Sequence, residues 1–555
     1  MDAGFGTIWE AVSDRLGGQA AVTDGDRVLS YADLEQQAAA LAASLSEAGV
    51  GAGSTVACYL HNCAEYLVAV FAAFKLGAAP VNVNYRYQGC ELAELLEDAG
   101  AQALVFDTVL RGHVAQAVEQ VTSLRLLVEV PDGSGAGSAG ADIGSLRPTV
   151  LELSAPAGAG LPRQARPGSD RLFMYTGGTT GRPKGVVWQQ GDLLAALAIQ
   201  VYGPLGRPAP ESFAEAVETA VWARGAGRSP VTMPVVPLIH GTGLFNTLGA
   251  LTAGGHVVLT GSRRLDPGQI WTLVARHAVS NLLVAGNAVL RPMLEALEAA
   301  EVAGTPYDIR SLRTMISSGT TLGDDLKRAL HERGDVTIYD GLAASEGGPF
   351  AFAVTSSPAD LPSRLRPTPG TRVLDADDRD VVPDGRHVGV LAYGGRLPLG
   401  YHNAPEKTAQ VYRVIDGHRY VVPGDYATLD ADGVLHFLGR GNGVVNSGGE
   451  KVYPAEVEEL LMAHELVDDA IVVGEPHEVW GEQVCALVAP VPGRADELDV
   501  DEVLDWMKQR MAGYKVPRRL VVLDSLERTP TGKIEFSWAR AMLARHPSTV
   551  TSGGR

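Results

Sequence analysis

The stretch Tyr175-Thr176-Gly177-Gly178-Thr179-Thr180-Gly181-Arg182-Pro183-Lys184-Gly185 decides how the rest of this chain is interpreted. It is a loop rich in Gly and Thr that follows the apolar run Leu172-Phe173-Met174 and ends in a lysine. Glycines let a loop turn its backbone N–H groups closely toward a phosphate, threonine hydroxyls add donors, and a lysine adds a positive charge. Because the chain contains only eight lysines, a lysine at this place favours a phosphate-binding loop over a plain surface turn.

The loop is not a Walker A motif, because that motif requires Gly-Lys-Ser/Thr at the start of a helix. Here Pro183 precedes Lys184, and Gly185 follows it. The sequence therefore predicts a phosphate site of another kind.

Composition indicates a large, acidic, globular protein. A length of 555 residues predicts two or more domains, and a hydrophobic fraction of 46% is ample for large cores. The net charge of -19 and the pI of about 5.1 disfavour a nucleic-acid partner, because phosphate backbones are bound by clustered cations. A site for an anionic ligand such as ATP or CoA must then be locally basic.

Neither the cysteines nor the apolar runs indicate an exported or membrane protein. Cys58, Cys63, Cys90 and Cys485 are too few for a disulfide scaffold and lack the spacing of zinc ligands. The first residues carry no basic segment of a signal peptide, and the longest apolar run, Tyr66–Phe74, is too short to span a bilayer. We therefore expect a soluble, cytoplasmic protein without a membrane span.

Strands alternate with helices through the first 300 residues, which is typical of an α/β fold with parallel sheets. Strands are predicted at 55–60, 80–85, 103–107, 256–260 and 281–286, and helices at 31–49, 65–76, 267–277 and 288–300. The stretches 131–145 and 155–169 are rich in small residues and Pro, and they are predicted as loops.

A second domain is predicted near residue 440, where a Gly-rich segment, 439–443, is followed by a new, short α/β pattern. Its predicted helices are 454–464 and 498–511, and its predicted strands are 470–474 and 484–491. The sequence thus predicts an N-terminal domain over residues 1–438, a small mobile C-terminal domain over 439–545, and a polar, disordered tail over 546–555.

Further motifs place reactive side chains in turns after apolar strands. They are Pro237–Gly243, Ser317–Leu322, Ile338–Gly347, Tyr420–Asp425, Leu438–Pro454 and Arg528–Ile534. Glu346 suits Mg²⁺, which favours one or two carboxylates together with substrate phosphates. The carboxylate of Asp425 can accept hydrogen bonds from both ribose hydroxyls. The ammonium of Lys533 can bridge a carboxylate and a phosphate and offset charge in a transition state.

In this order the motifs resemble those of the adenylate-forming superfamily, which includes acyl-CoA synthetases, luciferases and peptide-synthetase adenylation domains. The resemblance covers roughly residues 7–540, and it is closest to bacterial acyl-CoA synthetases for fatty acids and steroid side chains. It implies an α/β N-terminal domain of two α/β subdomains with a β-barrel-like part, capped by a small, mobile α+β domain.

The resemblance also implies roles for individual residues, with Lys533, Glu346 and His240 as the catalytic group. Lys533 would catalyse adenylation, Glu346 and Thr176 would bind Mg²⁺, and His240 would border the carboxylate pocket. The residues implied to bind ATP or CoA are Thr176, Gly177, Gly178, Thr179, Thr180, Gly181, Lys184, Ser318, Gly319, Thr320, Asp340, Gly341, Leu342, Ser345, Asp425, Arg440, Gly449 and Lys451. Many relatives carry an aromatic residue at the position of Leu342, which can pack against adenine but cannot stack on it.

The implied reaction has two steps. A carboxylic acid and MgATP give an acyl-adenylate and pyrophosphate, and the C-terminal domain then rotates about Gly439–Arg440 so that CoA takes the acyl group. Because the pocket segments are apolar, they indicate a hydrophobic or aromatic acid. Homodimer formation stays open.

Three alternatives also stay open. Some relatives of the same fold activate nitrite and diazotise an aromatic amine. A carrier-protein-loading enzyme is less favoured, because no carrier domain is fused and the basic segment Ala512–Arg519 resembles that of CoA-using relatives. A non-catalytic nucleotide-binding protein would have lost the reactive side chains, which are all present here.

Overall fold

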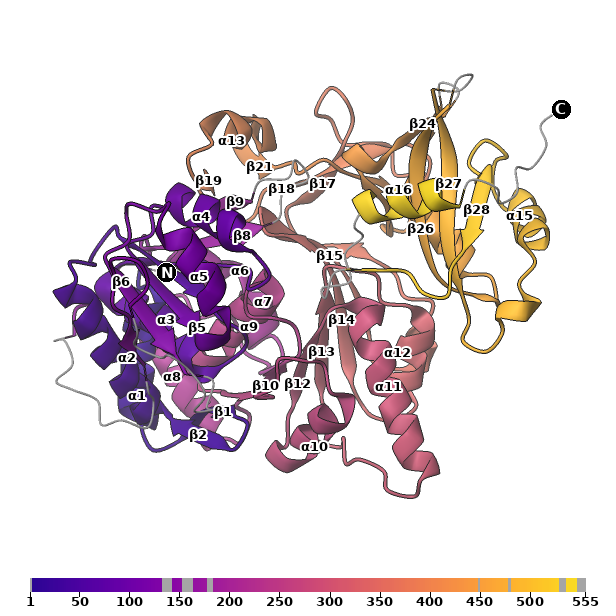
Figure 1. The fold of residues 1–555 in the computed structure, drawn as a ribbon. Helices are drawn as coiled ribbons and strands as arrows, with labels where there is room; N and C mark the ends of the chain where they lie inside the picture. Colours follow the sequence, from indigo (N-terminus) through magenta and orange to yellow (C-terminus); the bar gives the residue numbers. More distant parts are fainter. Residues whose placement is uncertain are drawn as a thin grey trace.

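We describe the fold from a computed structural model of the protein (Figure 1), and every statement below concerns its described residues. These are residues 2–131, 142–151, 163–176, 183–447, 450–477, 481–528 and 536–546, without the side chains of Arg440 and Lys451. The described residues form four sheets, three in the N-terminal part and one in the C-terminal part.

The first sheet has eight strands in the order β19-β9-β8-β4-β3-β5-β6-β7. They are β3 (Thr55–Tyr59), β4 (Ala79–Asn82), β5 (Ala103–Asp107), β6 (Leu126–Val130), β7 (Thr149–Val150), β8 (Arg171–Thr176), β9 (Lys184–Gln189) and β19 (Gly400–Tyr401). The strands from β8 to β7 are parallel, whereas β9 and β19 are antiparallel at one edge. The sheet therefore ends in two strands that bring distant parts of the chain together.

Helices around this sheet form the largest apolar core. They include α1 (Phe5–Leu16), α2 (Tyr31–Glu47) and α3 (Ala64–Leu76), whereas α4 (Gly89–Asp98) and α5 (Arg111–Val118) pack in a separate core against the same sheet. All residues of α3 are buried, and the ring of Trp9 stacks on those of Tyr31 and Phe71 at 5.0 and 4.3 Å between centroids. Lys75 is buried but paired, since its Nζ lies 2.5 Å from Glu10 and 2.6 Å from Glu35.

The second sheet has nine strands in the order β16-β15-β14-β13-β12-β10-β11-β1-β2, parallel from β14 to β1. They are β1 (Ala20–Asp24), β2 (Arg27–Ser30), β10 (Val231–Pro234), β11 (His256–Leu259), β12 (Asn281–Val284), β13 (Thr314–Ser318), β14 (Thr337–Ala344), β15 (Gly347–Thr355) and β16 (Arg366–Pro367). Helix α6 (Gln190–Ala196) contacts β9 of the first sheet. The other helices of this region are α7 (Ala198–Tyr202), α8 (Phe213–Gly225), α9 (Gly241–Thr252), α10 (Pro267–His277), α11 (Gly286–Val302) and α12 (Asp324–His331).

The predicted β-barrel-like part is a third sheet, antiparallel and six-stranded, in the order β20-β21-β18-β22-β23 with β17 beside β18. Its strands are β17 (Thr371–Leu374), β18 (Gly389–Tyr393), β20 (Tyr412–Ile415), β21 (His418–Val421), β22 (Asp425–Leu429) and β23 (Leu435–Arg440), with α13 (Pro405–Val411) leading into β20. The predicted domain boundary after residue 438 falls within β23 and stays a prediction.

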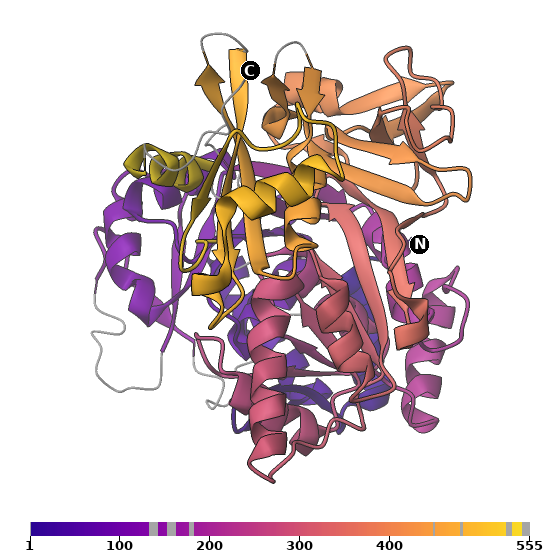
Figure 2. The same ribbon diagram turned by 90° about the vertical axis from the view of Figure 1, so that its right-hand side faces the viewer.

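The C-terminal part is built on a sheet in the order β25-β24-β27-β26, with β28 beside β27. Its elements are β24 (Val445–Ser447), β25 (Glu450–Val452), α14 (Pro454–Met462), β26 (Val467–His477), β27 (Gly481–Pro490), α15 (Val500–Lys508), β28 (Arg519–Val522) and α16 (Phe536–Arg545). Figures 1 and 2 place this part beside α11 and α12, with β24 at its outer end.

The predicted α/β class with a large N-terminal and a small C-terminal domain is confirmed. The predicted elements 103–107 and 267–277 match β5 and α10 at both ends. The strand expected at 80–85 is shorter, because β4 ends at Asn82. Most of the two predicted loops lies outside the described residues. In the part of the chain that is described, no helix is both long and apolar enough to cross a bilayer.

Candidate active site

Ser345 and Glu346 form the tip of a β-hairpin. Ala344 on β14 pairs with Gly347 on β15, so these two residues are the whole connection between the strands. Gly347 has φ +150°, and a Cβ there would lie 2.8 Å from Cγ1 of Val421. The hairpin tip is thus packed closely against the third sheet, and Glu346 projects from a well-fixed turn.

Lys184 and Thr176 lie opposite each other where β8 and β9 open into the predicted phosphate loop. Gly185 is required here, because a Cβ would lie 2.6 Å from the ring of Tyr175. The strand-to-loop-to-strand geometry places the predicted ends of the loop side by side. Gly177, Gly178, Thr179, Thr180 and Gly181 themselves lie outside the described residues.

The edge of the first sheet contacts the hairpin tip through two aromatic residues that sequence reasoning missed. The indole N–H of Trp188 on β9 donates to the carbonyl of Ser345 at 3.2 Å. The hydroxyl of Tyr401 on β19 donates to Oε1 of Glu346 at 2.8 Å, and Nζ of Lys184 lies 6.0 Å from the centre of the same ring. Lys184, Glu346 and Ser345, which are far apart in sequence, are therefore brought together.

His240 stands directly before α9, at the N-cap position, and is half-buried. The segment before it is fixed by Asn62, which accepts a hydrogen bond from the Leu238 N–H at 2.7 Å and donates to the Val236 carbonyl at 3.1 Å. The helix that follows contains no charged residue, and Phe245 on it packs edge-on against Trp188 with ring centroids 6.2 Å apart. His240 thus borders an apolar helix, and its predicted place beside the carboxylate pocket stays a prediction.

Asn82 joins the phosphate loop to the His240 segment, and it too was missed by sequence reasoning. Its Oδ1 accepts from the Tyr175 N–H at 2.5 Å, and its Nδ2 donates to the carbonyls of Tyr175 and Ile239 at 2.9 and 2.7 Å. Asn82 is 5% exposed. One buried amide therefore ties the residue before Thr176 to the residue before His240.

We predict that Asn82→Ala destabilises the protein by about 2–4 kcal/mol, because it leaves one N–H and two carbonyls buried without partners. The measurement is the shift of the denaturant unfolding midpoint. Asn84→Ala is the matched control, because the Asn84 side chain accepts only one exposed hydrogen bond, from the Arg86 N–H. Equal midpoints for the two variants would show that the buried amide is not a structural tie.

Strands β13 and β14 bring two further predicted segments side by side. Ser317 pairs with Asp340, and Ser318 pairs with Gly341. The carboxylate of Asp340 forms an ion pair with the buried Lys327, whose Nζ lies 2.8 Å away. Burial raises the pKa of Asp340. Leu342 packs with the core of the third sheet. The predicted contacts of Asp340 and Leu342 with ATP stay predictions.

The remaining predicted positions, Gly319 and Thr320, directly follow β13, and their contact with a ligand stays a prediction. Gly319 is exposed, and Thr320 is half-buried. The Thr320 hydroxyl is buried without a hydrogen-bond partner in the described structure.

Asp425 and Arg440, the predicted ribose contacts, are directly paired residues of β22 and β23. Asp425 is buried, and the turn before it is held by the Gly441 N–H, which donates to the Gly424 carbonyl at 2.8 Å. Lys451 is on β25, and Gly449 and Lys533 lie outside the described residues, so their roles stay predictions.

An ion pair joins the C-terminal part to α11. Nη2 of Arg291 lies 3.0 Å from Oδ1 of Asp468, and both side chains are partly exposed. The next residue, Asp469, binds Arg528 through hydrogen bonds of 2.6 and 2.8 Å, five residues before Lys533. Glu458 lies half-buried close to this pair, and loss of solvent around its carboxyl raises its pKa to about 7. The start of the predicted Lys533 segment is thus anchored beside the contact between the two parts.

We predict that Arg291→Ala increases the fraction of molecules with a displaced C-terminal part about fivefold, because a partly exposed ion pair contributes about 1 kcal/mol. Single-molecule energy transfer between dyes at positions 310 and 496, both exposed, would measure this fraction. The charge exchange Arg291→Asp with Asp468→Arg should restore the original distribution. No change in either variant would contradict a latching role for the pair.

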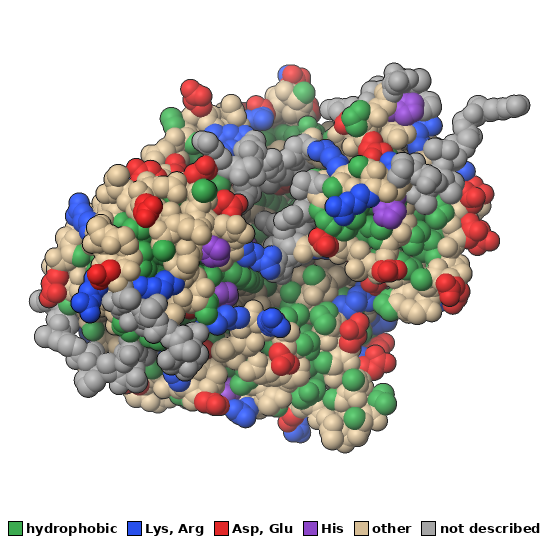
Figure 3. Space-filling view, in the orientation of Figure 1, with side chains coloured by type: hydrophobic (Ala, Val, Ile, Leu, Met, Phe, Trp, Pro, Cys, Tyr) green, Lys and Arg blue, Asp and Glu red, His purple; other side chains and the backbone are tan. Residues whose placement is uncertain are grey.

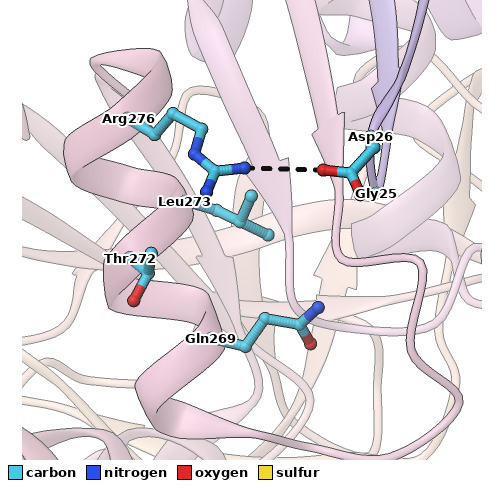
Figure 4. Close-up of a pocket in the computed structure, with 6 residues that line it drawn as sticks. All are labelled: Gly25, Asp26, Gln269, Thr272, Leu273 and Arg276. Atoms are coloured by element: carbon cyan, nitrogen blue, oxygen red, sulfur yellow. Dashed lines mark ion pairs between the residues drawn. The ribbon is translucent and has the colours of Figure 1, made fainter.

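The surface agrees with a site between the two parts of the protein. Figure 3 shows a hollow there, with Lys, Arg and His side chains gathered along its edge, although the protein is acidic overall. A separate surface pocket of about 330 Å³ lies between the β1–β2 turn and α10, where Arg276 faces Asp26 at 3.6 Å (Figure 4). It lies at the far edge of the nine-stranded sheet from β14, and the predicted site residues do not line it.

This architecture and this group of residues define an adenylate-forming enzyme. Over residues 9–402 the chain matches the family described as AMP-binding enzyme, and over residues 456–533 it matches the family described as AMP-binding enzyme C-terminal domain. The chain belongs to the AMP-binding enzyme family, which confirms the predicted superfamily.

Similar proteins include two bacterial ligases and one solved structure. The chain is 36% identical over 546 residues to the medium/long-chain-fatty-acid–CoA/3-oxocholest-4-en-26-oate–CoA ligase of Mycolicibacterium smegmatis, covering 97% of this chain and 95% of that one. It is 33% identical to the 3-oxocholest-4-en-26-oate–CoA ligase of Rhodococcus rhodochrous, covering 99% and 97%. The structure of the anthranilate CoA ligase AuaEII in complex with anthranoyl-AMP has a TM-score of 0.79 at 22% identity, covers 98% of both chains, and shows the fold.

Proposed function

We propose that this chain activates a hydrophobic carboxylic acid of the fatty or steroid type as an acyl-adenylate and transfers the acyl group to CoA. The chain is an AMP-forming acid–CoA ligase. We assign its site from one observation, which is that Lys184, Tyr401 and Glu346 lie close together at the hairpin tip. The ammonium of Lys184, a cation for phosphates, lies near the ring of Tyr401, and the carboxylate of Glu346, a ligand for a metal, accepts its hydroxyl.

The residues at the tip fit Mg²⁺. Oε1 of Glu346 accepts the Tyr401 hydroxyl, and Oε2 has no hydrogen-bond partner among the described residues. Glu346 would therefore hold the ion through one carboxylate oxygen, together with Thr176 and substrate phosphate oxygens. Mg²⁺ would supply charge stabilisation for the departing pyrophosphate.

The other predicted residues have separate binding and catalytic roles in the two steps. Lys184 and the loop around it bind phosphates, and Asp425 with Arg440 binds the ribose. His240 borders the acid, and Lys533 lies between the acid carboxylate and the α-phosphate, where its charge stabilises the transition state. Rotation of the C-terminal domain, over residues 439–545, then replaces Lys533 by Gly449 and Lys451 for attack by the CoA thiol.

The apolar character of α9 and of the Trp188–Phe245 pair supports a hydrophobic acid. The two bacterial ligases narrow this class to fatty and steroid acids.

Pyrophosphate release from MgATP, measured across aliphatic, steroid, aromatic and nitrite substrates with and without CoA, tests this function. Release with fatty or steroid acids, and an acyl-CoA product only when CoA is present, is the expected result. Release with nitrite and no effect of CoA would instead assign the diazotising reaction.

A further inference from the structure

Tyr401 is held at the edge of the first sheet by its own backbone. It pairs with Val186 across β19 and β9, and its N–H donates to Oγ1 of Thr408 at 2.9 Å. The next residue, His402, donates its N–H to the Gly185 carbonyl at 2.7 Å. The ring therefore has a fixed starting point beside Lys184.

From this point the side chain reaches Glu346, which is 55 residues away in sequence. The hydroxyl donates to Oε1 at 2.8 Å, while the face of the ring lies within 6.0 Å of Nζ of Lys184. This distance is within the range of cation–π attraction. The side chain thus contacts both charged groups predicted to act on the phosphates of ATP.

We propose that Tyr401 is a positioning residue, which orients the Glu346 carboxylate so that one oxygen is held and the other faces the metal of MgATP. This inference rests on the proposed function. A carboxylate at a hairpin tip rotates freely unless one oxygen is held, and hydrogen bonds from neighbouring groups orient metal ligands and tune their affinity. The Tyr401 hydroxyl supplies that bond, and Nζ of Lys184 lies 6.0 Å from the centre of the same ring.

Tyr412 provides a matched control within the same site. Its hydroxyl also donates to Glu346 at 2.8 Å, but to the backbone carbonyl instead of the carboxylate. Burial, followed by the charge of Glu346, raises the pKa of Tyr412, so this hydroxyl stays protonated at neutral pH. Tyr412 fixes the backbone of the hairpin tip, whereas Tyr401 fixes the carboxylate.

The test compares Tyr401→Phe and Tyr412→Phe, each of which removes one hydroxyl and keeps the ring. Calorimetry measures ATP binding to the whole protein with Mg²⁺ and with EDTA. For Tyr401→Phe we expect the Mg²⁺-dependent part of the affinity to fall about tenfold, while binding in EDTA and the unfolding midpoint stay unchanged. For Tyr412→Phe we expect no change in the Mg²⁺-dependent part.

Two results would overturn the inference. One is an unchanged Mg²⁺ dependence in Tyr401→Phe, and the other is an equal loss in both variants, which would assign the effect to the hairpin backbone. A double-mutant cycle with Glu346→Gln adds a second test, because the amide has no charge to orient. Loss of the Tyr401 hydroxyl should then have no further effect on Mg²⁺ dependence, and an undiminished effect would contradict the proposal.

Failure of this inference is distinguishable from failure of the proposed function. ATP binding is measured without an acid, so it reports on Tyr401 whatever the acid is. If the unaltered protein released no pyrophosphate with any fatty or steroid acid, the proposed function would fail while the calorimetric comparison still decided the role of Tyr401.

Discussion

Lys533→Ala should lower pyrophosphate release at least about 100-fold and leave the transfer of an acyl group from a supplied acyl-adenylate to CoA unchanged. The reason is electrostatic, because an ammonium group between two anions stabilises charge that develops only when the acid attacks the α-phosphate. Thioester formation starts after that charge has formed, so it does not need this lysine.

The structure supports this division through the anchoring of the segment. Arg528, five residues before Lys533, is tied to Asp469, whose neighbour Asp468 contacts Arg291 of the N-terminal part. The start of the segment therefore lies at the side of the C-terminal part that contacts α11, whereas β24 lies at its outer end (Figure 1). This arrangement fits the orientation that we propose for adenylation.

Lys508→Ala is the control for Lys533→Ala. Lys508 lies in the same part of the chain, and it is exposed and paired with Asp505 on one helix. Its loss should leave both half-reactions unchanged. If Lys533→Ala abolished both half-reactions, or neither of them, the assignment of Lys533 to adenylation would be wrong.

Glu346→Gln should lower kcat/KM for MgATP by roughly 100-fold. The amide can still accept the Tyr401 hydroxyl at 2.8 Å, so the turn should keep its shape. It carries no negative charge, however, and Mg²⁺ favours carboxylates over neutral amides. The loss should therefore appear as a higher Mg²⁺ concentration for half-maximal activity, measured by titrating the metal at fixed ATP.

Glu406→Gln, on the exposed face of α13, removes a charge of the same type away from the hairpin tip. It should leave the metal titration unchanged. A Glu346→Gln enzyme with the same metal titration as the unaltered enzyme would remove Glu346 from the metal site.

The sequence predicts a helix or strand correctly where residues within that element, or directly next to it, determine its ends. Helix α10 was predicted to the residue, because Pro267 occupies its first position after Asp266, which accepts the Gln269 N–H at 3.0 Å. Strand β5 was predicted because it is a short apolar run that is buried throughout. No local pattern shows the role of Asn82 at the end of β4, because its amide bonds Tyr175, 93 residues away.

The candidate site also contains some residues that the sequence predicts and some that it does not. Lys184, Glu346 and Asp425 were predicted because they belong to motifs with a recognisable order. Tyr401 and Trp188 were missed, because each looks like an ordinary aromatic residue of a strand until β9, β19 and the hairpin are brought together. A buried polar contact between distant segments has no periodic signal in one sequence.

The measurement that tests the central claim most directly uses a fatty or steroid acid with both carboxylate oxygens replaced by ¹⁸O. The acid, MgATP and CoA are incubated with the enzyme, and the masses of AMP, acyl-CoA and pyrophosphate are measured by mass spectrometry. If the carboxylate attacks the α-phosphate, AMP gains one ¹⁸O, acyl-CoA keeps the other, and pyrophosphate gains none. Label in pyrophosphate or phosphate, or unlabelled AMP beside acyl-CoA, would contradict an acyl-adenylate route.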